Sequence, residues 1–272
     1  MLKKIINKFI LHYIAKNIKP NHKMIVCYND WLGANIIVNG CYERNELEIL
    51  RKNFSDELKN STFLDIGANI GNHTLFFCNF FNKIKSFEPQ LRTFKILKLN
   101  TELYPNIEVF NFGIDVSEKN LTFHIPYSNS GMGSQYGKNI DTYSEEVKFM
   151  PINENTFDEV GYIKIDVEGN ELKVIEGISG ILKKNKPIIS FELNQDREFR
   201  IELITLLKSN GYSDFYVSDK NVFPGNNRIL NLFYGGPKKL VKISKTELVE
   251  NKADYSLVTS FIESSKFKLN VK

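Results

Sequence analysis

Residues 63–77 read FLDIGANIGNHTLFF, and this stretch decides the fold. An apolar strand ends near Asp65, a glycine-rich turn follows, and an apolar helix begins directly after the turn. Glycines at such a place permit a tight turn and let a ligand approach the backbone at the carboxyl end of a strand. The free N–H groups at the start of the helix favour an anionic ligand group. The pattern predicts a site for a nucleoside-containing ligand.

The rest of the chain repeats this strand–helix alternation. Apolar strand patterns lie at 63–66, 84–87, 107–110, 162–165, 188–191 and 215–217, and helical patterns lie at 70–79, 91–103, 169–183 and 197–209. Alternating strands and helices predict a mostly parallel, doubly wound α/β sheet with helices on both faces.

Three further segments flank or interrupt this core. We predict an N-terminal extension over 1–59, with an amphipathic helix, short strands at 24–38 and a helix at 44–58. The core spans 60–236 and includes a late strand at 228–234. A polar, glycine-rich insertion at about 120–150 interrupts it, and a long loop of this kind is usually functional. Residues 237–272 form a C-terminal extension.

Composition excludes several classes of protein. The 272 residues are 42% hydrophobic and 25% charged, which is typical of a globular chain and not of a disordered or coiled-coil one. A net charge of +4 is too small to indicate a nucleic-acid partner. The three cysteines, Cys27, Cys41 and Cys78, form no CxxC pair, so we expect reduced thiols in a cytoplasmic protein.

The N-terminal segment has no apolar run of the ~20 residues that a membrane-spanning helix needs. Its apolar residues recur at helical spacing between lysines: Leu2, Ile5, Ile6, Phe9, Tyr13 and Ile14. A helix of this kind usually docks on its own domain, which is the interpretation we favour. Peripheral contact with an anionic membrane is the alternative.

The nature of the ligand follows from the residues around the glycines. Glu88 lies 23 positions after Asp65, at the end of the next strand, where an acid accepts hydrogen bonds from ribose hydroxyls. Asn69 and Asn72 occupy the second and third glycine positions of a dinucleotide fingerprint, which disfavours NAD. An acid just before the glycines suits a ligand with an amino-acid end. S-adenosylmethionine is such a ligand, so we predict this cofactor, with an NAD-dependent oxidoreductase as the alternative.

Two later motifs place carboxylates at the same edge of the sheet. In YIKIDVEGNELKVIEG (162–177), Asp166 and Glu168 follow a strand, and in KPIISFEL (186–193) Glu192 follows the next one. Such groups can accept a proton, orient a cofactor or hold a metal. We predict no metal site, because no third oxygen ligand is evident and the histidines lack metal-ligand spacing. His73 opens the helix after the glycine turn, from where it could approach the ligand, and a structural role is the interpretation we favour for it.

Taken in order, these motifs resemble the FkbM-type methyltransferases, a branch of the class I S-adenosylmethionine-dependent enzymes. The resemblance covers about residues 38–195 and includes GCYERNELEIL at 40–50. It implies a seven-stranded Rossmann-like sheet and methyl transfer to an oxygen, commonly a hydroxyl of a sugar, glycan or natural product. The cofactor residues that it implies are Asp65, Gly67, Ala68, Asn69, Gly71, Asn72, Glu88, Gly113, Ile114, Asp166 and Glu168.

The expected mechanism needs a base, because a sugar hydroxyl is a poor nucleophile. Asp166 is the first candidate, with His73 and Glu192 in reserve, and the loop at 127–142 is expected to cover the acceptor. N-methylation of an amide or phosphoramidate, and a non-catalytic binding module, stay open as alternatives. No N/D-P-P-Y/F motif is present, so we expect a small-molecule or glycan acceptor and no nucleic acid.

Overall fold

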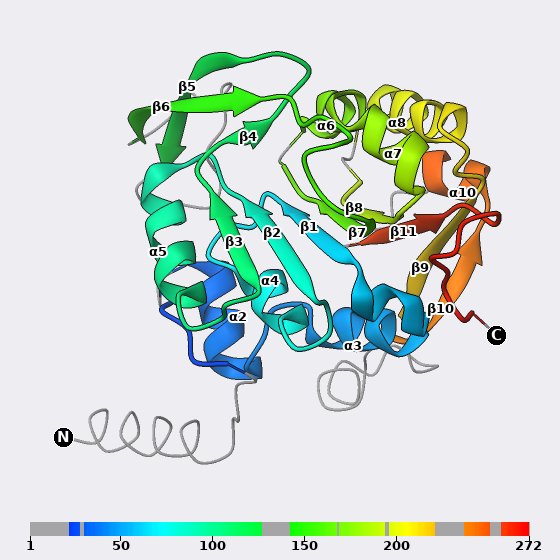
Figure 1. The fold of residues 1–272 in the computed structure, drawn as a ribbon, viewed down its shortest axis with the longest axis horizontal. Coiled ribbons are helices and arrows are strands. Elements are labelled where there is room, and N and C mark those ends of the chain that lie inside the picture. Colours follow the sequence, from blue (N-terminus) through cyan, green and yellow to red (C-terminus); the bar gives the residue numbers. More distant parts are fainter. Residues whose placement is uncertain are drawn as a thin grey trace.

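A central sheet has the strand order β10-β9-β11-β8-β7-β1-β2-β3 (Figure 1). The computed structural model describes residues 22–27, 30–126, 142–167, 169–193, 196–220, 237–250 and 257–271. The strands are β1 (Thr62–Ile66), β2 (Lys83–Phe87), β3 (Ile107–Phe110), β7 (Val160–Ile165), β8 (Ile188–Phe191), β9 (Asp214–Lys220), β10 (Pro237–Ile243) and β11 (Val258–Phe261).

Strand direction identifies the type of sheet. Strands β3, β2, β1, β7 and β8 run parallel to one another. Strand β11 runs antiparallel between β8 and β9, and β10 pairs antiparallel with β9 at the edge. The expected seven-stranded, mostly parallel α/β sheet is therefore present, and β10 adds an eighth strand to it.

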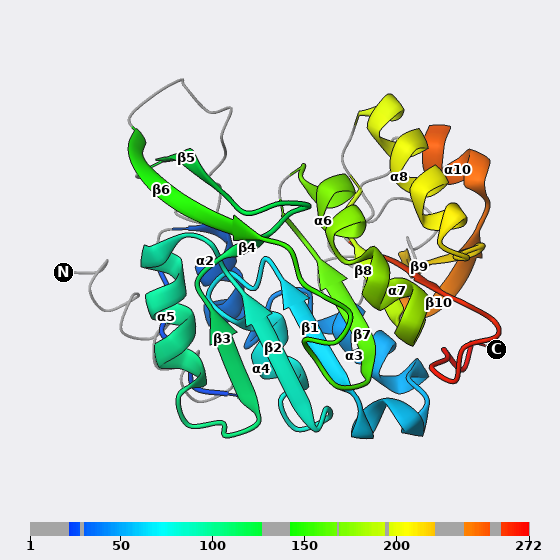
Figure 2. The ribbon, with the colours of Figure 1, turned by 45° about the horizontal axis from the view of Figure 1, so that its top comes forward.

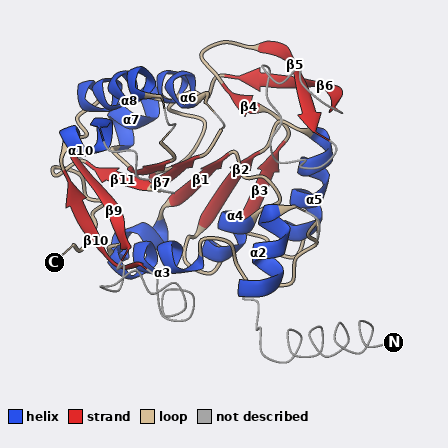
Figure 3. Cartoon of the chain, turned by 180° about the vertical axis from the view of Figure 1, so that it is seen from behind, coloured by secondary structure: helices blue, strands red, loops and turns tan. Residues whose placement is uncertain are grey.

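Helices cover both faces of the sheet, as Figures 1 and 2 show. They are α2 (Trp31–Asn39), α3 (Arg44–Asn53), α4 (Asn72–Phe77), α5 (Leu91–Thr101), α6 (Glu171–Gly177), α7 (Ser179–Asn185), α8 (Arg197–Ser209) and α10 (Lys245–Glu250), with a 3-10 helix, η1 (Asp56–Asn60). Seen from behind in Figure 3, α6, α7, α8 and α10 lie together on one side of the sheet, away from α3 and α4.

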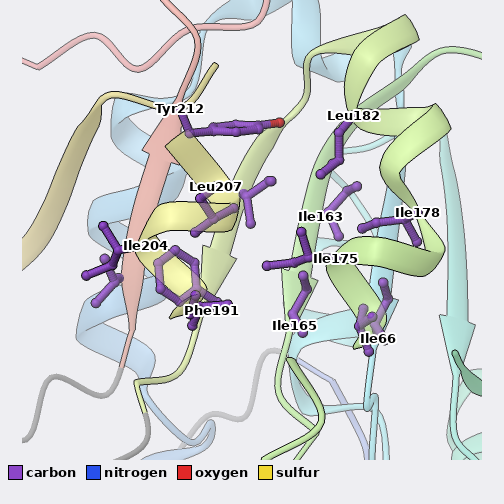
Figure 4. Packing of buried hydrophobic residues seen from close by; sticks show 14 of the residues in the cluster. Ile66, Ile163, Ile165, Ile175, Ile178, Leu182, Phe191, Ile204, Leu207 and Tyr212 are labelled. Atoms are coloured by element: carbon purple, nitrogen blue, oxygen red, sulfur yellow. The ribbon is translucent and has the colours of Figure 1, made fainter. Parts of the chain in front are cut away.

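Two apolar cores result, one on each face. Successive side chains of a strand point to opposite faces, so Ile163 and Ile165 of β7 join the core beneath α6, α7 and α8, whereas Tyr162 joins the core beneath α3 and α4. Figure 4 shows the first core, with Ile163 and Ile165 directed at Ile175 of α6. Burial on both faces explains why β7 is apolar apart from Lys164.

The prediction of short strands at 24–38 is wrong, because helix α2 occupies much of this segment. The Asp30 side chain accepts a hydrogen bond from the backbone N–H of Gly33 at 2.6 Å and caps the helix. Gly40 ends it in the left-handed conformation, with φ 76°. The short apolar run Ile36–Val38 suits a helix and a strand equally well, so the caps decide. The helix expected over 44–58 ends at Asn53, and η1 follows.

The predicted insertion forms a separate small sheet with β4 (Gly113–Ile114), which lies just before it. The strand order is β4, β6 (Thr142–Met150) and β5 (Lys119–Pro126). Residues 127–141, which include nearly all of the predicted acceptor-covering loop, lie outside the described residues. So do the predicted N-terminal amphipathic helix, the late strand at 228–234 and Glu168.

Residues 237–272, expected as a C-terminal extension, contribute β10, α10 and β11 to the fold. Strand β11 lies inside the central sheet, bonded on both sides. Across the described ranges, no helix combines the length and hydropathy needed to span a membrane.

Candidate active site

The glycine turn joins β1 to both neighbouring strands. The backbone N–H groups of Gly67 and Ala68 donate to the carbonyl oxygen of Phe87 at 3.0 and 2.9 Å, which ties the turn to β2. Gly67 has φ +79°, and a Cβ added there would lie 1.8 Å from the carbonyl oxygen of Asp166. Asn69 and Gly71 also have positive φ, at 51° and 95°. Close packing against the end of β7 therefore determines the conformation of the turn at Gly67.

Glu88 lies directly beside this turn. Its Oε2 accepts a hydrogen bond from the N–H of Asn69 at 3.1 Å, and its Oε1 accepts one from the N–H of Gln90 at 2.9 Å. Burial raises the pKa of Glu88 to about 7, although these hydrogen bonds act in the opposite direction. Each carboxylate oxygen keeps a further lone pair for another donor. Hydroxyl donors from a ligand would stabilise the charged form.

Beneath the turn, Lys164 joins the carboxylates of β1 and β7. Its Nζ lies 3.0 Å from Asp166 Oδ2 and 3.9 Å from Asp65 Oδ1. Burial opposes the charge of Lys164, but the two carboxylates outweigh this and raise its pKa. Asp65 is fully buried, and its Oδ2 accepts a hydrogen bond from Thr74 at 2.6 Å. Asp65 can therefore influence a ligand mainly through Lys164.

Asp166 reaches the surface of this cluster, because its side chain is 36% exposed. Burial favours its neutral form, but the charge and hydrogen bond of Lys164, with help from His73, outweigh burial and lower its pKa. Glu192, which follows β8, also hydrogen-bonds with the Asp166 side chain. This hydrogen bond lowers the pKa of Asp166 further.

His73 lies in the first turn of α4, and its Nε2 lies 3.1 Å from Glu43 Oε2. The structure therefore brings the three expected catalytic side chains, Asp166, His73 and Glu192, to one place.

The segment before α3 contributes two residues that the sequence did not single out, Tyr42 and Glu43. The Asn72 side chain accepts from the N–H of Tyr42 and donates to its carbonyl oxygen, both at 3.0 Å. Burial, followed by the negative charges of Glu43, Glu192 and Asp166, raises the pKa of Tyr42 to about 12. Tyr42 thus faces the carboxylate cluster, and the amide of Asn72 holds this segment.

This chain resembles a known protein family and several solved structures. The family model described as "Methyltransferase FkbM domain" matches residues 65–213. The chain belongs to the FkbM methyltransferase family. Membership confirms the resemblance that the motifs indicated, and it implies S-adenosylmethionine as the methyl donor.

Individual relatives of this FkbM chain are distant. It is 25% identical over 145 residues to the hexuronic acid methyltransferase AglP of Haloferax volcanii, a match that covers 52% of this chain and 59% of AglP. The crystal structure of an FkbM methyltransferase from Methylobacillus flagellatus superposes with a TM-score of 0.45 and 14% identity, covering 90% of this chain and 63% of that one. A putative methyltransferase from Streptococcus mutans in complex with SAH gives 0.43 and 10%, covering 79% and 95%.

The glycine turn and Glu88 fit the cofactor of the FkbM family. Glu88 is a buried carboxylate whose charge is incompletely compensated, which suits two hydroxyl donors of a ribose. Asp65 Oδ1 is buried and accepts no hydrogen bond from the described residues, so the cluster below the turn keeps unused acceptor capacity.

Other residues expected to bind the cofactor have packing roles in this FkbM fold. A Cβ on Gly113 would lie 2.3 Å from the Phe149 ring, and Ile114 is buried in the apolar core. The Asn72 side chain is committed to Tyr42. Among the described residues, no three His, Cys, Asp or Glu side chains gather as metal ligands, and Lys164 supplies the positive charge between Asp65 and Asp166.

Proposed function

We propose that this chain is an S-adenosylmethionine-dependent O-methyltransferase that acts on a hydroxyl of a sugar or glycan. The observation that carries the proposal is an ionised, partly exposed carboxylate, Asp166, beside the glycine turn of an FkbM domain. The name of the relative AglP, a hexuronic acid methyltransferase, supports a sugar acceptor.

The binding roles follow from position. Glu88 accepts the ribose hydroxyls, and the backbone of Gly67, Ala68, Asn69 and Gly71 lines the cofactor. Lys164 lies between Asp65 and Asp166 and offsets part of their negative charge beneath the turn. When bound, S-adenosylmethionine supplies a methyl group that is already activated by a sulfonium. The protein then mainly aligns the acceptor oxygen, and such orientation contributes on the order of 7–11 kcal/mol at best.

The remaining task is to remove the hydroxyl proton. Asp166 is the proposed acceptor, because it is ionised at neutral pH and is the more exposed member of its pair with Lys164. A carboxylate with a lowered pKa is a weak base, so it acts late, as the oxygen loses electron density to the methyl carbon. His73, held by Glu43, and Glu192 are the alternative acceptors.

A hexuronic acid offers both hydroxyl and carboxylate oxygens, and only a hydroxyl needs a base. A screen for S-adenosylhomocysteine release should therefore compare neutral nucleotide-activated sugars, hexuronic acids, their methyl esters and amino sugars. We expect turnover with neutral sugars or with the esters, and its loss in Asp166→Asn. Turnover with free hexuronic acids but not with their esters would point to the carboxylate. Turnover of amino sugars alone would point to nitrogen.

A further inference from the structure

One face of the molecule exposes apolar side chains from three segments, and we call it the α2–α5 surface. Trp31 is 71% exposed and Leu103 is 83% exposed. Ile25, Val38 and Leu99 are also more than half exposed. Ile25 precedes α2, Trp31 and Val38 lie on α2, and Leu99 and Leu103 lie at the end of α5 or just beyond it.

Hydrogen bonds hold these segments together. The Asn100 side chain accepts from the N–H of Ile25 at 2.7 Å and donates to its carbonyl oxygen at 3.1 Å. His22 Nδ1 lies 2.7 Å from the hydroxyl of Tyr104. Residues 22–27 are therefore fixed along the end of α5, and Figures 1 and 3 show α2 beside the same helix. Trp31 and Val38 are seven residues apart, so they share one face of α2.

The exposed charges of α5 are positive, and one exposed acid, Glu102, follows the helix. Arg92, Lys95 and Lys98 are exposed on α5, three residues apart from one another, and the exposed Leu91 and Leu99 lie next to the first and last of them. No ion pair within the described ranges involves these three cations. Exposed apolar and basic side chains mixed on one face are typical of segments that bind at a membrane interface.

The N-terminal sequence has the same character. Of the 36 basic and 32 acidic residues, residues 1–29 contain six lysines and no acid, which leaves 30 basic and 32 acidic residues in the rest of the chain. The positive excess of the whole chain therefore comes from the segment that leads into α2. A second copy of the same basic face does not suit the α2–α5 surface as an occupant, because like charges repel.

We propose that the α2–α5 surface binds an anionic membrane surface, with Trp31 inserted at the lipid headgroups and the lysines of α5 against the lipid phosphates. The exposed leucines beside these basic residues favour a membrane over a nucleic acid as the partner. The proposal is independent of the methylation reaction.

Trp31 is the single tryptophan of the chain, so its fluorescence reports the contact directly. The full chain is mixed with vesicles of phosphatidylcholine alone or with an equal share of phosphatidylglycerol, and binding is measured by co-sedimentation. We expect binding and a blue shift of Trp31 emission only with phosphatidylglycerol, and release at 0.5 M NaCl.

The double charge reversal Lys95→Glu/Lys98→Glu should weaken binding at least tenfold. Lys173→Glu/Lys208→Glu is the matched control, because both lysines are exposed on α6 and α8. Circular dichroism confirms that each variant is folded. Absence of vesicle binding, equal binding by the two double variants, or a concentration-dependent blue shift without vesicles would each overturn the proposal. The last result would indicate a second copy as the partner.

Discussion

At the scale of single residues, Glu88 indicates the chemistry of the ligand most specifically. A carboxylate that is buried and accepts only two backbone hydrogen bonds is under-stabilised as an anion, which is why burial raises its pKa to about 7. Ribose hydroxyls form stronger hydrogen bonds to the ionised carboxylate than to the neutral carboxyl group. Binding should therefore be coupled to loss of a proton.

We expect the affinity for S-adenosylhomocysteine to depend on pH. Below pH 7 Glu88 must lose a proton on binding, so Kd should rise by up to tenfold for each pH unit as the pH falls, and it should be constant above about pH 8. Calorimetry between pH 5.5 and 8.5 measures this. Glu88→Gln should bind more weakly at pH 8 and lose the pH dependence. A flat profile in the wild-type protein would remove Glu88 from the ribose role.

Gly67→Ala tests the packing of the glycine turn. The new Cβ would lie 1.8 Å from the Asp166 carbonyl oxygen at a positive φ, so we expect a loss of about 3 kcal/mol or more in the free energy of unfolding. Gly71→Ala is the control, because its Cβ would meet only the flexible end of Leu97 at 2.9 Å. It should cost about 1–2 kcal/mol through its backbone strain. Urea denaturation compares them, and equal losses would contradict this explanation.

At the scale of elements, α4 fixes the segment that precedes α3. The Asn72 side chain forms two hydrogen bonds with the Tyr42 backbone, in the way that a neighbouring strand would. The two residues are 30 positions apart, so this contact joins distant parts of the chain. His73 in the same helix pairs with Glu43, which has a strained φ of 54°. Tyr42 and Glu43 owe their place beside Asp166 to this helix.

Asn72→Ala should release that segment. Removing the amide leaves the N–H and carbonyl of Tyr42 without these partners, so we expect a loss of about 1–3 kcal/mol in stability and faster amide exchange at Tyr42. Hydrogen exchange followed by mass spectrometry of peptides that cover residues 38–48 measures it. Asn35→Ala, on the exposed face of α2, should change neither quantity. Unchanged protection in Asn72→Ala would show that other contacts hold the segment.

At the scale of the whole molecule, the C-terminal segment supplies a strand inside the central sheet. Strand β11 lies between β8 and β9, where Thr259 pairs with Ser190 on one side and with Tyr216 on the other. Val258 is fully buried in the same core as α6 and α8. Residues 258–261 therefore belong to the central sheet and its core, although they are far along the chain from β8.

A chain that ends at residue 256 should lack cooperative thermal unfolding, because β8 and β9 would each lose a ladder partner and the core would lose Val258. A chain that ends at residue 270 retains β11 and serves as the control. Differential scanning calorimetry distinguishes them. A sharp transition in the shorter chain would mean that the sheet forms without β11.

Features set by neighbouring residues could be predicted from the sequence, whereas features set by contacts between residues far apart in the chain could not. Strands buried on both faces, such as β1 and β7, are mostly apolar apart from Asp65 and Lys164. Acids after such strands fall at one edge of a parallel sheet. Asp166, Glu88 and Glu192 could thus be placed from local patterns. Tyr42 and Glu43 could not, because the pairing with Asn72 and His73 is long-range. Strand β10 also escaped prediction, because its lysines resemble a polar tail while an edge strand tolerates them.

The central claim is that the glycine turn and Glu88 bind S-adenosylmethionine, and calorimetry of wild type and Glu88→Ala with S-adenosylhomocysteine and with NAD at pH 8 tests it most directly. We expect a micromolar Kd for S-adenosylhomocysteine, no NAD binding, and a Kd weakened by about 1–3 kcal/mol in the variant. NAD binding in place of S-adenosylhomocysteine, or an unchanged Kd in Glu88→Ala, would contradict the account.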